Sequence, residues 1–446
     1  MARLQDLEQA ARSLAERGDD AAAIPIWQQI LAQNPDHPIA LLSVGDAARR
    51  QGDGEKAETL LRHAVRVAPR LVPARCALAN LLLYSGREDE AGTLLEQATS
   101  LSPSTPYVWR DLGLWHRVNG RPAAALEAFD RALALSPNDA AAALGRSLCL
   151  LRLGRWAEGF AAYHYRWSVA GRPPRHGTIP QWRGEGDLAG KRLLVWDEQG
   201  AGDTIMCARL IQPLLAAGAD VCFECPTALV PLFLDGRFGR PIARGQPLPP
   251  MDMQVALLDL PGLLGLTPQT IPWHGPYLAA DPAQLESWGR RLPRQGNRPR
   301  IGISWAGNPA HPGDRWRTPG LEALLPLLER SGIDWYALQV ASGRDQLDAT
   351  PLPAHVTDLG GMITGWGDSA AILSHLDLLI TPDSALCHLA GAMGRPVWTL
   401  ISTDTDWRWL EDGNRTGWYP SMRLFRQKSR GDWAGLLSRL IPALPT

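Results

Sequence analysis

The chain has 446 residues, of which 45% are apolar and 20% are charged, as is usual for globular proteins. This length predicts two or three domains, because single hydrophobic cores rarely grow so large. A net charge of −1 excludes a global attraction to nucleic acid or to an anionic membrane. No apolar run reaches the ~18 residues of a membrane span, and the N-terminus has no signal pattern. We therefore expect a cytoplasmic protein without stable membrane insertion.

Six cysteines are scattered through segments with core character, and two of them, Cys222 and Cys225, form a C-x-x-C motif. This motif lies in the strand-like run Val221–Cys225 and has no second cysteine pair, as a zinc site of this type would need. We expect reduced, buried thiols and no metal.

Glycine and proline each recur every 34 residues in the first third of the chain. The repeated positions are Gly18, Gly52, Gly86, Gly120 and Gly154, and Pro35, Pro69, Pro103 and Pro137. Glycine permits the left-handed turn between two helices, and proline ends the second helix. At fixed offsets from each glycine stand a small and then a bulky residue: Ala23 and Trp27, Ala57 and Leu61, Ala91 and Leu95, Ala125 and Phe129, Gly159 and Tyr163. This pattern predicts stacked helical hairpins.

The fourth unit, with Trp109-x-x-Leu112-Gly113 and Ala125-x-x-x-Phe129, resembles the tetratricopeptide repeat. We expect about five such repeats in residues 1–170. The fifth departs from the pattern at Gly159 and Arg166 and lacks the closing proline, which indicates a joint to the next domain. Such arrays offer a groove to a protein or peptide. The alternative is a rigid spacer or dimerisation arm.

From residue 191 the period changes, after a linker at 171–190. Seven apolar runs are typical of strands: Arg192–Trp196, Val221–Cys225, Gln254–Leu258, Ile301–Trp305, Trp335–Val340, Leu376–Thr381 and Val397–Ile401. Helical patterns stand between them, at Thr204–Ala217, Pro319–Ser331, Ser369–Ser374 and Ser384–Met393. Strand–helix alternation predicts parallel sheets with sites at the carboxyl ends of the strands. A break near Ala279–Arg298 divides this half into two doubly wound lobes, 191–285 and 286–446.

Polar segments follow three of these strands. The first, Glu198-Gln199-Gly200-Ala201-Gly202-Asp203-Thr204, has two glycines that free the backbone, and Asp203 is both a helix N-cap and a carboxylate facing the cleft. The alternative is that Asp203 only caps the helix.

The second segment runs from Trp305 through Gly307, Asn308 and His311 to Asp314-Arg315-Trp316-Arg317. A Gly-Asn turn followed by two arginines suits a diphosphate, and the alternative is a solvated surface loop.

The third segment, Asp383-Ser384-Ala385-x-x-His388, opens a helix of small residues whose first-turn amides suit a phosphate or ribose. His388 lies one turn beyond Ser384 on the same face, and the alternative is a satisfied core histidine.

Together and in this order, these segments resemble glycosyltransferases of the heptosyltransferase type, in the bacterial branch where tetratricopeptide repeats precede the transferase, similar to O-linked N-acetylglucosamine transferases. The likeness also includes Trp182-Arg183-Gly184-Glu185 and the tail with Asp406-Trp407-Arg408-Trp409-Leu410 and Trp418-Tyr419-Pro420. It implies a GT-B fold of two Rossmann-like lobes, a nucleotide-sugar donor held by the C-terminal lobe, and metal-independent, inverting transfer.

The resemblance also implies residue roles. Asp203 falls on the acceptor-activating base, and donor contacts fall on Gly202, Gly307, Asn308, Asp383, Ser384, Ala385 and His388. Arg315 stands near the phosphate-contacting lysine of the family, a departure that changes the donor geometry. Gln339 lies where the base or ribose is contacted. Trp407 and Trp409 are candidates for the acceptor side, with core packing as the alternative.

A D-x-D at Asp404-Thr405-Asp406 would suit a metal-dependent GT-A enzyme, but the rest of that pattern is missing, and we interpret it as coincidence. The leading hypothesis is a protein O-glycosyltransferase whose repeats dock a polypeptide, with flagellin as one acceptor and a nonulosonic acid or a hexosamine as the sugar. The alternatives are a transferase acting on lipopolysaccharide core or another glycan, and a non-catalytic repeat scaffold. No cofactor beyond the nucleotide-sugar substrate is expected.

Overall fold

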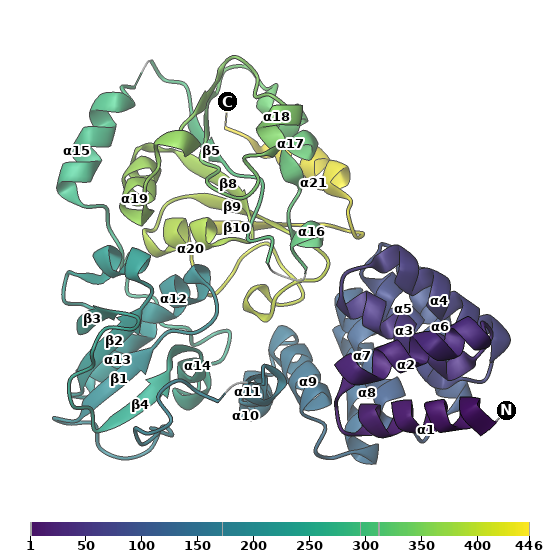
Figure 1. Ribbon diagram of the computed structural model, residues 1–446. Coiled ribbons are helices and arrows are strands. Elements are labelled where there is room, and N and C mark those ends of the chain that lie inside the picture. The colour runs from purple at the N-terminus through teal and green to yellow at the C-terminus, as the bar shows by residue number, and fades with distance from the viewer. Residues whose placement is uncertain (1, 172, 295, 311–312, 446) are drawn as a thin grey trace. The chain divides into compact units, whose positions relative to one another are not determined.

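The computed structural model describes residues 2–171, 173–294, 296–310 and 313–445 (Figure 1). Contacts divide the chain into two compact units, Met1–Arg146 and Ser147–Thr446. The boundary falls inside the fifth hairpin, so that the end of the repeat array belongs to the same unit as the two lobes that follow it. Of the helices in the described ranges, none has the length and apolar character needed to cross a membrane.

The first unit is built of antiparallel helix pairs, as the 34-residue period predicts. Its helices are α1 (Ala2–Glu16), α2 (Asp20–Gln33), α3 (Pro38–Arg50), α4 (Gly54–Val67), α5 (Val72–Leu83), α6 (Glu88–Leu101), α7 (Pro106–Val118), α8 (Pro122–Leu135) and the first part of α9 (Ala140–Arg152). The five repeated glycines all have positive φ angles, between 71° and 83°. The repeated alanines are at most 1% exposed and the bulky residues after them at most 2% exposed. The tetratricopeptide prediction is thus confirmed.

The fifth hairpin continues into the second unit with α10 (Trp156–Tyr163) and a short α11 (Tyr165–Val169). Gly159 replaces alanine because the helices approach closely: a Cβ there would lie 2.6 Å from Cδ2 of Leu151. Arg166, which replaces a small residue, turns toward the following lobe (see below).

The N-terminal lobe has a parallel sheet of order β3-β2-β1-β4. Its elements are β1 (Arg192–Trp196), α12 (Ala201–Cys207), α13 (Ile211–Ala216), β2 (Asp220–Cys225), β3 (Arg240–Ala243), β4 (Met253–Ala256) and α14 (Leu260–Leu263), with 3-10 turns η1 (Ala208–Leu210), η2 (Thr227–Phe233) and η3 (Leu257–Asp259). The expected single helix Thr204–Ala217 is wrong: Pro213 interrupts it, because proline clashes with the preceding turn. Cys222 and Cys225 are buried in β2 at positions of opposite parity, so their thiols lie on opposite faces and do not share one ion.

The C-terminal lobe has a six-stranded parallel sheet of order β10-β9-β8-β5-β6-β7. The strands are β5 (Arg300–Ile303), β6 (Asp334–Ala337), β7 (Val356–Asp358), β8 (Leu378–Pro382), β9 (Val397–Ile401) and β10 (Met422–Arg426). The helices are α15 (Pro282–Arg291), α16 (Asp314–Arg317), α17 (Gly320–Leu328), α18 (Gln346–Ala349), α19 (Trp366–His375), α20 (Ala385–Ala392) and α21 (Trp433–Leu440), with 3-10 turns η4 (Gly360–Met362), η5 (Trp407–Trp409) and η6 (Ile441–Ala443). The fold class predicted from the sequence, a helical repeat array followed by two doubly wound lobes, is confirmed.

Several elements of this unit were not predicted. The strands β3, β7 and β10 lie at sheet edges and lack a long apolar run. The expected break at Ala279–Arg298 contains α15, which begins at a capping residue, Asp281, and packs against α19 through the buried Trp288.

Candidate active site at the carboxyl edges of the two sheets

Both sheets have the strand order 3-2-1-4, continued to 5 and 6 in the C-terminal lobe. In such open sheets ligands bind outside the carboxyl ends of strands 1 and 4, where the chain reverses its direction of winding. These points lie between β1 and β4 in one lobe and between β5 and β8 in the other. The three polar segments predicted from the sequence follow β1, β5 and β8, and so all three stand at these positions.

The segment after β1 combines a strained residue with a capped helix. Gln199 has a φ of 61°, which is rare outside glycine, and its side-chain amide donates to the Tyr163 hydroxyl at 3.0 Å. Helix α12 starts at Ala201, with Gly200 as its N-cap. The backbone N–H of Gly200 donates to Oδ2 of Asp203 at 2.8 Å. The prediction that Asp203 is itself the N-cap is therefore wrong by three residues, although its carboxylate does stabilise the helix start.

The other oxygen of the Asp203 carboxylate faces a cation. Oδ1 lies 2.6 Å from Nη2 of Arg408, a buried residue of η5, and Nη1 of Arg408 donates to Asp406 at 2.7 Å. Burial raises the pKa of Asp203, while the Arg408 charge and the Gly200 N–H work against this rise. The side chain of Asp203 is 19% exposed. An aspartate held this way keeps free lone pairs toward solvent and has the features of a general base.

Gly202 brings this segment against the third one. A Cβ at Gly202 would lie 2.8 Å from Cδ2 of His388 and 3.2 Å from Cα of Ala385. Only glycine permits this approach, and α12 and α20 lie side by side as a result. The structure therefore brings together Asp203 and Ala385 at the start of α20, although the two are far apart in sequence.

The segment after β8 is held by Arg317, the second of the two arginines in the segment that the sequence analysis found suited to a diphosphate. Nη2 of Arg317 donates to the carbonyl of Asp383 at 2.6 Å and lies 3.3 Å from its carboxylate. The hydroxyl of Ser384 lies 3.1 Å from that of Thr381, which itself contacts the Ser304 hydroxyl at 2.7 Å. These contacts join the ends of β5 and β8 and leave the first amides of α20 at the edge of the sheet.

His388 is buried and neutral. Its ring stacks on Trp409 at 5.2 Å between centroids, and Nδ1 lies 3.1 Å from the Tyr419 hydroxyl. Burial lowers the pKa of His388 to about 4. These contacts are those of the core histidine that stood as the alternative, although the ring also touches the position of Gly202.

Asp383, Cys387 and His388 have potential metal-ligand atoms within 4.8 Å of one another. However, burial raises the pKa of the Cys387 thiol, whose Sγ donates to the Ser384 carbonyl at 3.0 Å. A thiol must be deprotonated to bind a metal, so this group is a poor ligand set.

The segment after β5 is placed less directly. Gly307 packs against Asp314, and Oδ1 of the exposed Asn308 accepts from the Ala310 N–H at 3.0 Å. Arg315 is exposed and stacks on Trp316 at 3.9 Å. His311 lies outside the described residues. The arginine that reaches α20 is thus Arg317, two positions from the one that the resemblance indicated.

Gln339, at the end of β6, is buried and fully bonded. Its Oε1 accepts from the N–H groups of Trp305 and Ala306 at 2.9 and 3.0 Å, and its Nε2 donates to the Ser342 carbonyl at 2.6 Å. In this arrangement the Gln339 amide fixes the loop that carries Gly307.

Buried hydrogen-bond donors gather at the carboxyl ends of the C-terminal strands. Among the buried polar atoms that make no hydrogen bond within the described part of the chain are Nε1 of Trp316, Nε of Arg317, Oγ1 of Thr403 and Nε2 of Gln427, in segments that follow β5, β9 and β10. Unsatisfied buried donors are rare in native proteins. N–H and O–H groups that converge on one edge suit an oxygen-rich anion such as a diphosphate.

The two acceptor-side tryptophans are packed inside the protein. Trp407 is 3% exposed and contacts Trp156, Phe160 and Trp418 edge-on, and Trp409 is 1% exposed. The burial of both tryptophans agrees with the packing alternative rather than with rings that stack on a bound acceptor.

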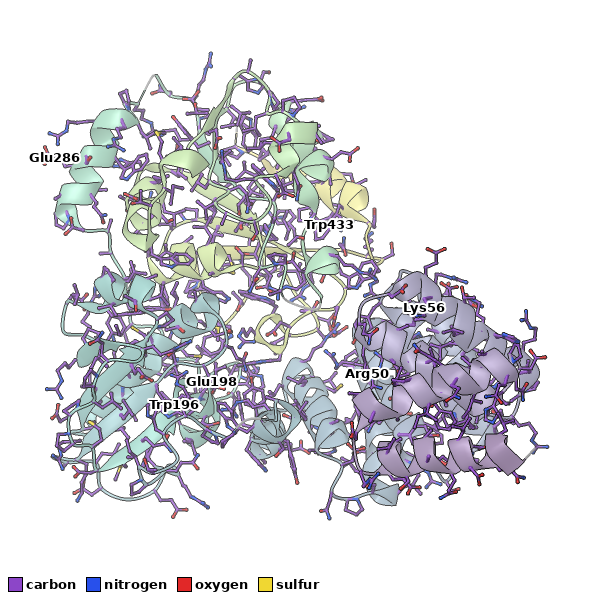
Figure 2. The ribbon with its side chains drawn as sticks, viewed as in Figure 1. Arg50, Lys56, Trp196, Glu198, Glu286 and Trp433 are labelled. Carbon is purple, nitrogen blue, oxygen red and sulfur yellow. The ribbon has the colours of Figure 1, made fainter. Side chains whose placement is uncertain are left out.

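The joint between the repeats and the N-terminal lobe lies at the fifth repeat, where the departure at Arg166 indicated it, but the partners of Arg166 were not predicted. Arg166 donates Nε and Nη2 to Glu198 at 2.8 and 2.7 Å and also Nη2 to Asp259 at 2.7 Å, in a buried network beside Trp196 (Figure 2). This network ties α11 to the segment that leads to Asp203. The signal was present in the sequence, since an arginine occupied a position that the repeat reserves for a small residue.

Comparisons with known proteins agree with both halves of the chain. The tetratricopeptide repeat model matches residues 9–71, 76–140 and 116–165, and the glycosyltransferase family 9 (heptosyltransferase) model matches residues 353–411. The second match includes the α20 segment and Arg408. Protein FlbA of Caulobacter vibrioides is 27% identical over 96% of this chain and 82% of its own length.

Two solved structures each match little more than a third of this chain. A tetratricopeptide repeat protein of Thermus thermophilus is 22% identical, with a TM-score of 0.34, over 38% of this chain and 92% of its own. A MamA structure is 19% identical, with a TM-score of 0.30, over 36% of this chain and 94% of its own.

Proposed function

We propose that this chain, a glycosyltransferase similar to family 9 that carries tetratricopeptide repeats, is a protein O-glycosyltransferase. In this proposal the repeats dock a polypeptide, and the two lobes transfer a sugar from a nucleotide-sugar donor to one of its serine or threonine hydroxyls. Flagellin is one acceptor to test, with a nonulosonic acid or a hexosamine as the sugar. The cytoplasm is the proposed compartment, in keeping with six free, buried cysteines.

One observation carries the chemical part of this proposal: the Asp203 carboxylate lies next to the start of α20. Glycosyl transfer to a hydroxyl needs a base that removes the hydroxyl proton as the oxygen attacks the anomeric carbon. Asp203 has a pKa raised by burial, which strengthens it as a base, and the neighbouring Arg408 keeps it ionised. We assign the proton transfer to Asp203.

The departing nucleotide needs its negative charge stabilised. We assign this role to Arg317, to the first amides of α20 at Ser384 and Ala385, and to the unsatisfied donors of Trp316 and Gln427. Because cationic and N–H groups supply the charge, the proposed transfer needs no metal ion. A single base on one side of the anomeric carbon supports inversion.

The test uses purified full-length protein and a panel of nucleotide sugars with different bases and sugars. A donor should raise the melting temperature, since a ligand that binds only the folded state stabilises it. This shift should persist in EDTA and should fall in Arg317→Gln. If every nucleotide sugar fails to shift the melting temperature, a non-catalytic scaffold is the better account. If a donor binds but only glycans accept the sugar, the enzyme acts on lipopolysaccharide or a related glycan.

A further inference from the structure

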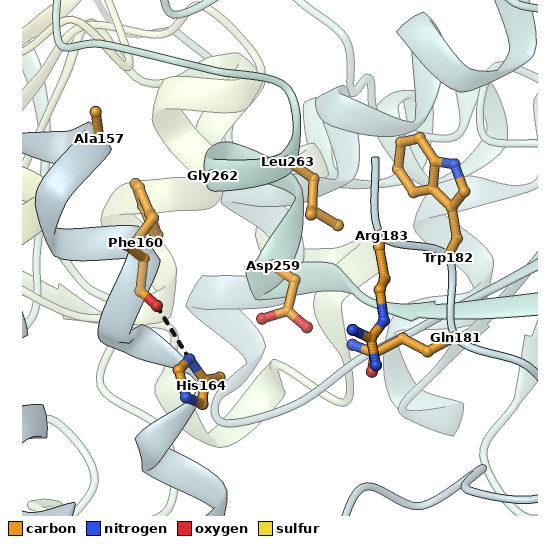
Figure 3. Close-up of a pocket in the computed structure, with 10 residues that line it drawn as sticks. Ala157, Phe160, His164, Gln181, Trp182, Arg183, Asp259, Gly262 and Leu263 are labelled. Atoms are coloured by element: carbon orange, nitrogen blue, oxygen red, sulfur yellow. Dashed lines mark hydrogen bonds between the residues drawn. The ribbon is translucent and has the colours of Figure 1, made fainter. Parts of the chain in front are cut away.

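A pocket of about 560 Å³ lies between the end of the repeat array and the N-terminal lobe (Figure 3). One wall is α10, with Ala157, Phe160 and Ala161, and the other is the start of α14 after β4. The rim is formed by Gln181, Trp182 and Arg183. All of these residues belong to one compact unit.

The position of this pocket in the fold is that of a ligand site. Its inner wall follows β4, and the Asp203 segment follows β1, so both stand at the reversal point of the N-terminal sheet. Asp259 lines the pocket and accepts from Arg166 at 2.7 Å, and Arg166 also holds Glu198. A ligand in the pocket would therefore lie one side chain away from the strained segment that carries the proposed base.

The walls of the pocket are built for close approach. A Cβ at Gly262 would lie 2.6 Å from Cβ of Phe160, so α10 and α14 meet only because this residue is glycine. Phe160, Leu263 and the two alanines of α10 form the apolar surface of the pocket. Trp182 is 6% exposed and does not present its ring face. Phe160 is half-buried, and its ring already makes edge-to-face contacts with Trp156, Tyr163 and Trp407, so the pocket suits an alkyl side chain better than a sugar ring.

The rim carries polar groups that no other part of the protein uses. Arg183 and Gln181 are exposed, and within the described ranges their side chains make no hydrogen bond or ion pair. Figure 3 shows the two side chains together, opposite His164 and beside Asp259. Asp259 is paired with Arg166, which it shares with Glu198, whereas the Arg183 guanidinium makes no ion pair within the described ranges and is open to a partner. A carboxylate is its natural partner.

We infer that this pocket binds the acceptor polypeptide beside the modified hydroxyl, as a short extended segment that places an aliphatic side chain against Phe160 and Leu263 and an acidic side chain against Arg183. The inference rests on the proposed function and adds to it a local sequence preference. The occupant is a polypeptide because the apolar wall is contributed by α10, a helix of the fifth repeat in the array that is proposed to dock it.

Two substitutions test the pocket without touching the Asp203 network. Ala161→Trp fills the pocket from the exposed side of α10, and Arg183→Glu reverses the charge of its rim. Ala283→Trp and Arg290→Glu are matched controls, since they make the same changes at exposed positions of α15. The probe is a library of fluorescent 13-residue peptides, each with a central serine and varied flanking positions.

Peptide binding to the full-length protein is measured by fluorescence anisotropy without any nucleotide sugar. The natural sequence should prefer peptides with one aliphatic and one acidic flanking residue. Arg183→Glu should exchange the acidic preference for a basic one, and Ala161→Trp should weaken binding by about 10-fold or more, which corresponds to ~1.4 kcal/mol. Both controls should behave like the natural sequence.

Unchanged peptide preferences in both variants would overturn the inference. The inference would also be overturned if the natural sequence bound oligosaccharides and no peptides, and if Ala161→Trp lost this oligosaccharide binding. Neither result depends on transfer, whereas failure of the proposed function would be seen as absence of donor binding in the natural sequence. The two failures are therefore distinguishable.

Discussion

Acidification should destabilise the C-terminal lobe through His388, and His388→Asn should remove this effect. The ring is 4% exposed and packs against Trp409 and Tyr419, and burial lowers its pKa to about 4. Among the charged groups around it, Asp383 and Asp406 favour its protonation, and Arg408 and Arg209 oppose it. Asparagine keeps a polar atom near the Nδ1 position and does not titrate.

The sign follows from the two states of the chain. An unfolded histidine binds a proton near pH 6.5, whereas folded His388 binds one only near pH 4. The stability that the folded state gains from keeping His388 neutral is therefore fully present above the unfolded pKa of 6.5, and it is lost as the pH falls toward 4. Between pH 7.5 and pH 5 this effect lowers the free energy of unfolding by about 2 kcal/mol, which is about 30-fold in the unfolding equilibrium constant.

Native-state hydrogen exchange of peptides that cover residues 378–401 measures this change. After correction for the intrinsic exchange rates, protection in urea should fall between pH 7.5 and pH 5 by about 30-fold more in the natural sequence than in His388→Asn. His355→Asn changes an exposed histidine of the same lobe, and this control should keep the full drop. An equal drop in the natural sequence and His388→Asn would refute the assignment of a buried, neutral histidine.

Substitutions at Gly202, Arg408 and Arg317 test the site itself, with Arg315 as a comparison. Gly202→Ala should separate α12 from α20, cost about 1–3 kcal/mol in urea unfolding and lower the transfer rate, whereas an unchanged rate would mean that this contact does not position the site. Arg408→Gln should move the acid limb of the kcat/KM profile to higher pH, because the Arg408 charge opposes the rise of the Asp203 pKa. Arg408→Lys keeps the charge and should return the acid limb most of the way to its position in the natural sequence. In calorimetric titrations Arg317→Gln should weaken donor binding by about 10- to 100-fold, as expected for a charge-assisted hydrogen bond, and Arg315→Gln should weaken it less. The reverse order would support the position that the family resemblance indicated.

The repeat array was predictable because its signal is local and periodic. Each hairpin needs a left-handed turn at a position such as Gly86, where φ is 83°, and a small residue such as Ala91 inside the helix pair. These requirements recur at one spacing, and a single sequence therefore suffices to detect them. The lobes were predictable to the extent that their central strands are apolar runs, whereas edge strands such as β7 bury few side chains.

The site was predicted in its segments but not in its partners. The loops with Asp203 and Asp383 follow buried strands, and their place at a sheet edge follows from strand order. Arg408 pairs with Asp203 and Arg317 pairs with Asp383. These arginines come from short elements with no regular sequence pattern, and only the tertiary fold brings them near their partners. Gln339 is the opposite case. It follows a strand of the C-terminal lobe as predicted, but its side-chain amide accepts hydrogen bonds from the backbone N–H groups of Trp305 and Ala306.

The most direct test of the central claim is the intact mass of a candidate acceptor polypeptide, such as a flagellin, co-expressed with the full-length protein. We predict a mass increase of one or more sugar units, located on serine or threonine by fragmentation. Asp203→Asn should abolish the increase and still bind the donor, whereas Asp235→Asn, an exposed aspartate of the same lobe, should leave the increase intact. Full modification by the Asp203→Asn variant would contradict the assignment of Asp203 as the base, and absence of modification on every polypeptide would contradict the protein acceptor.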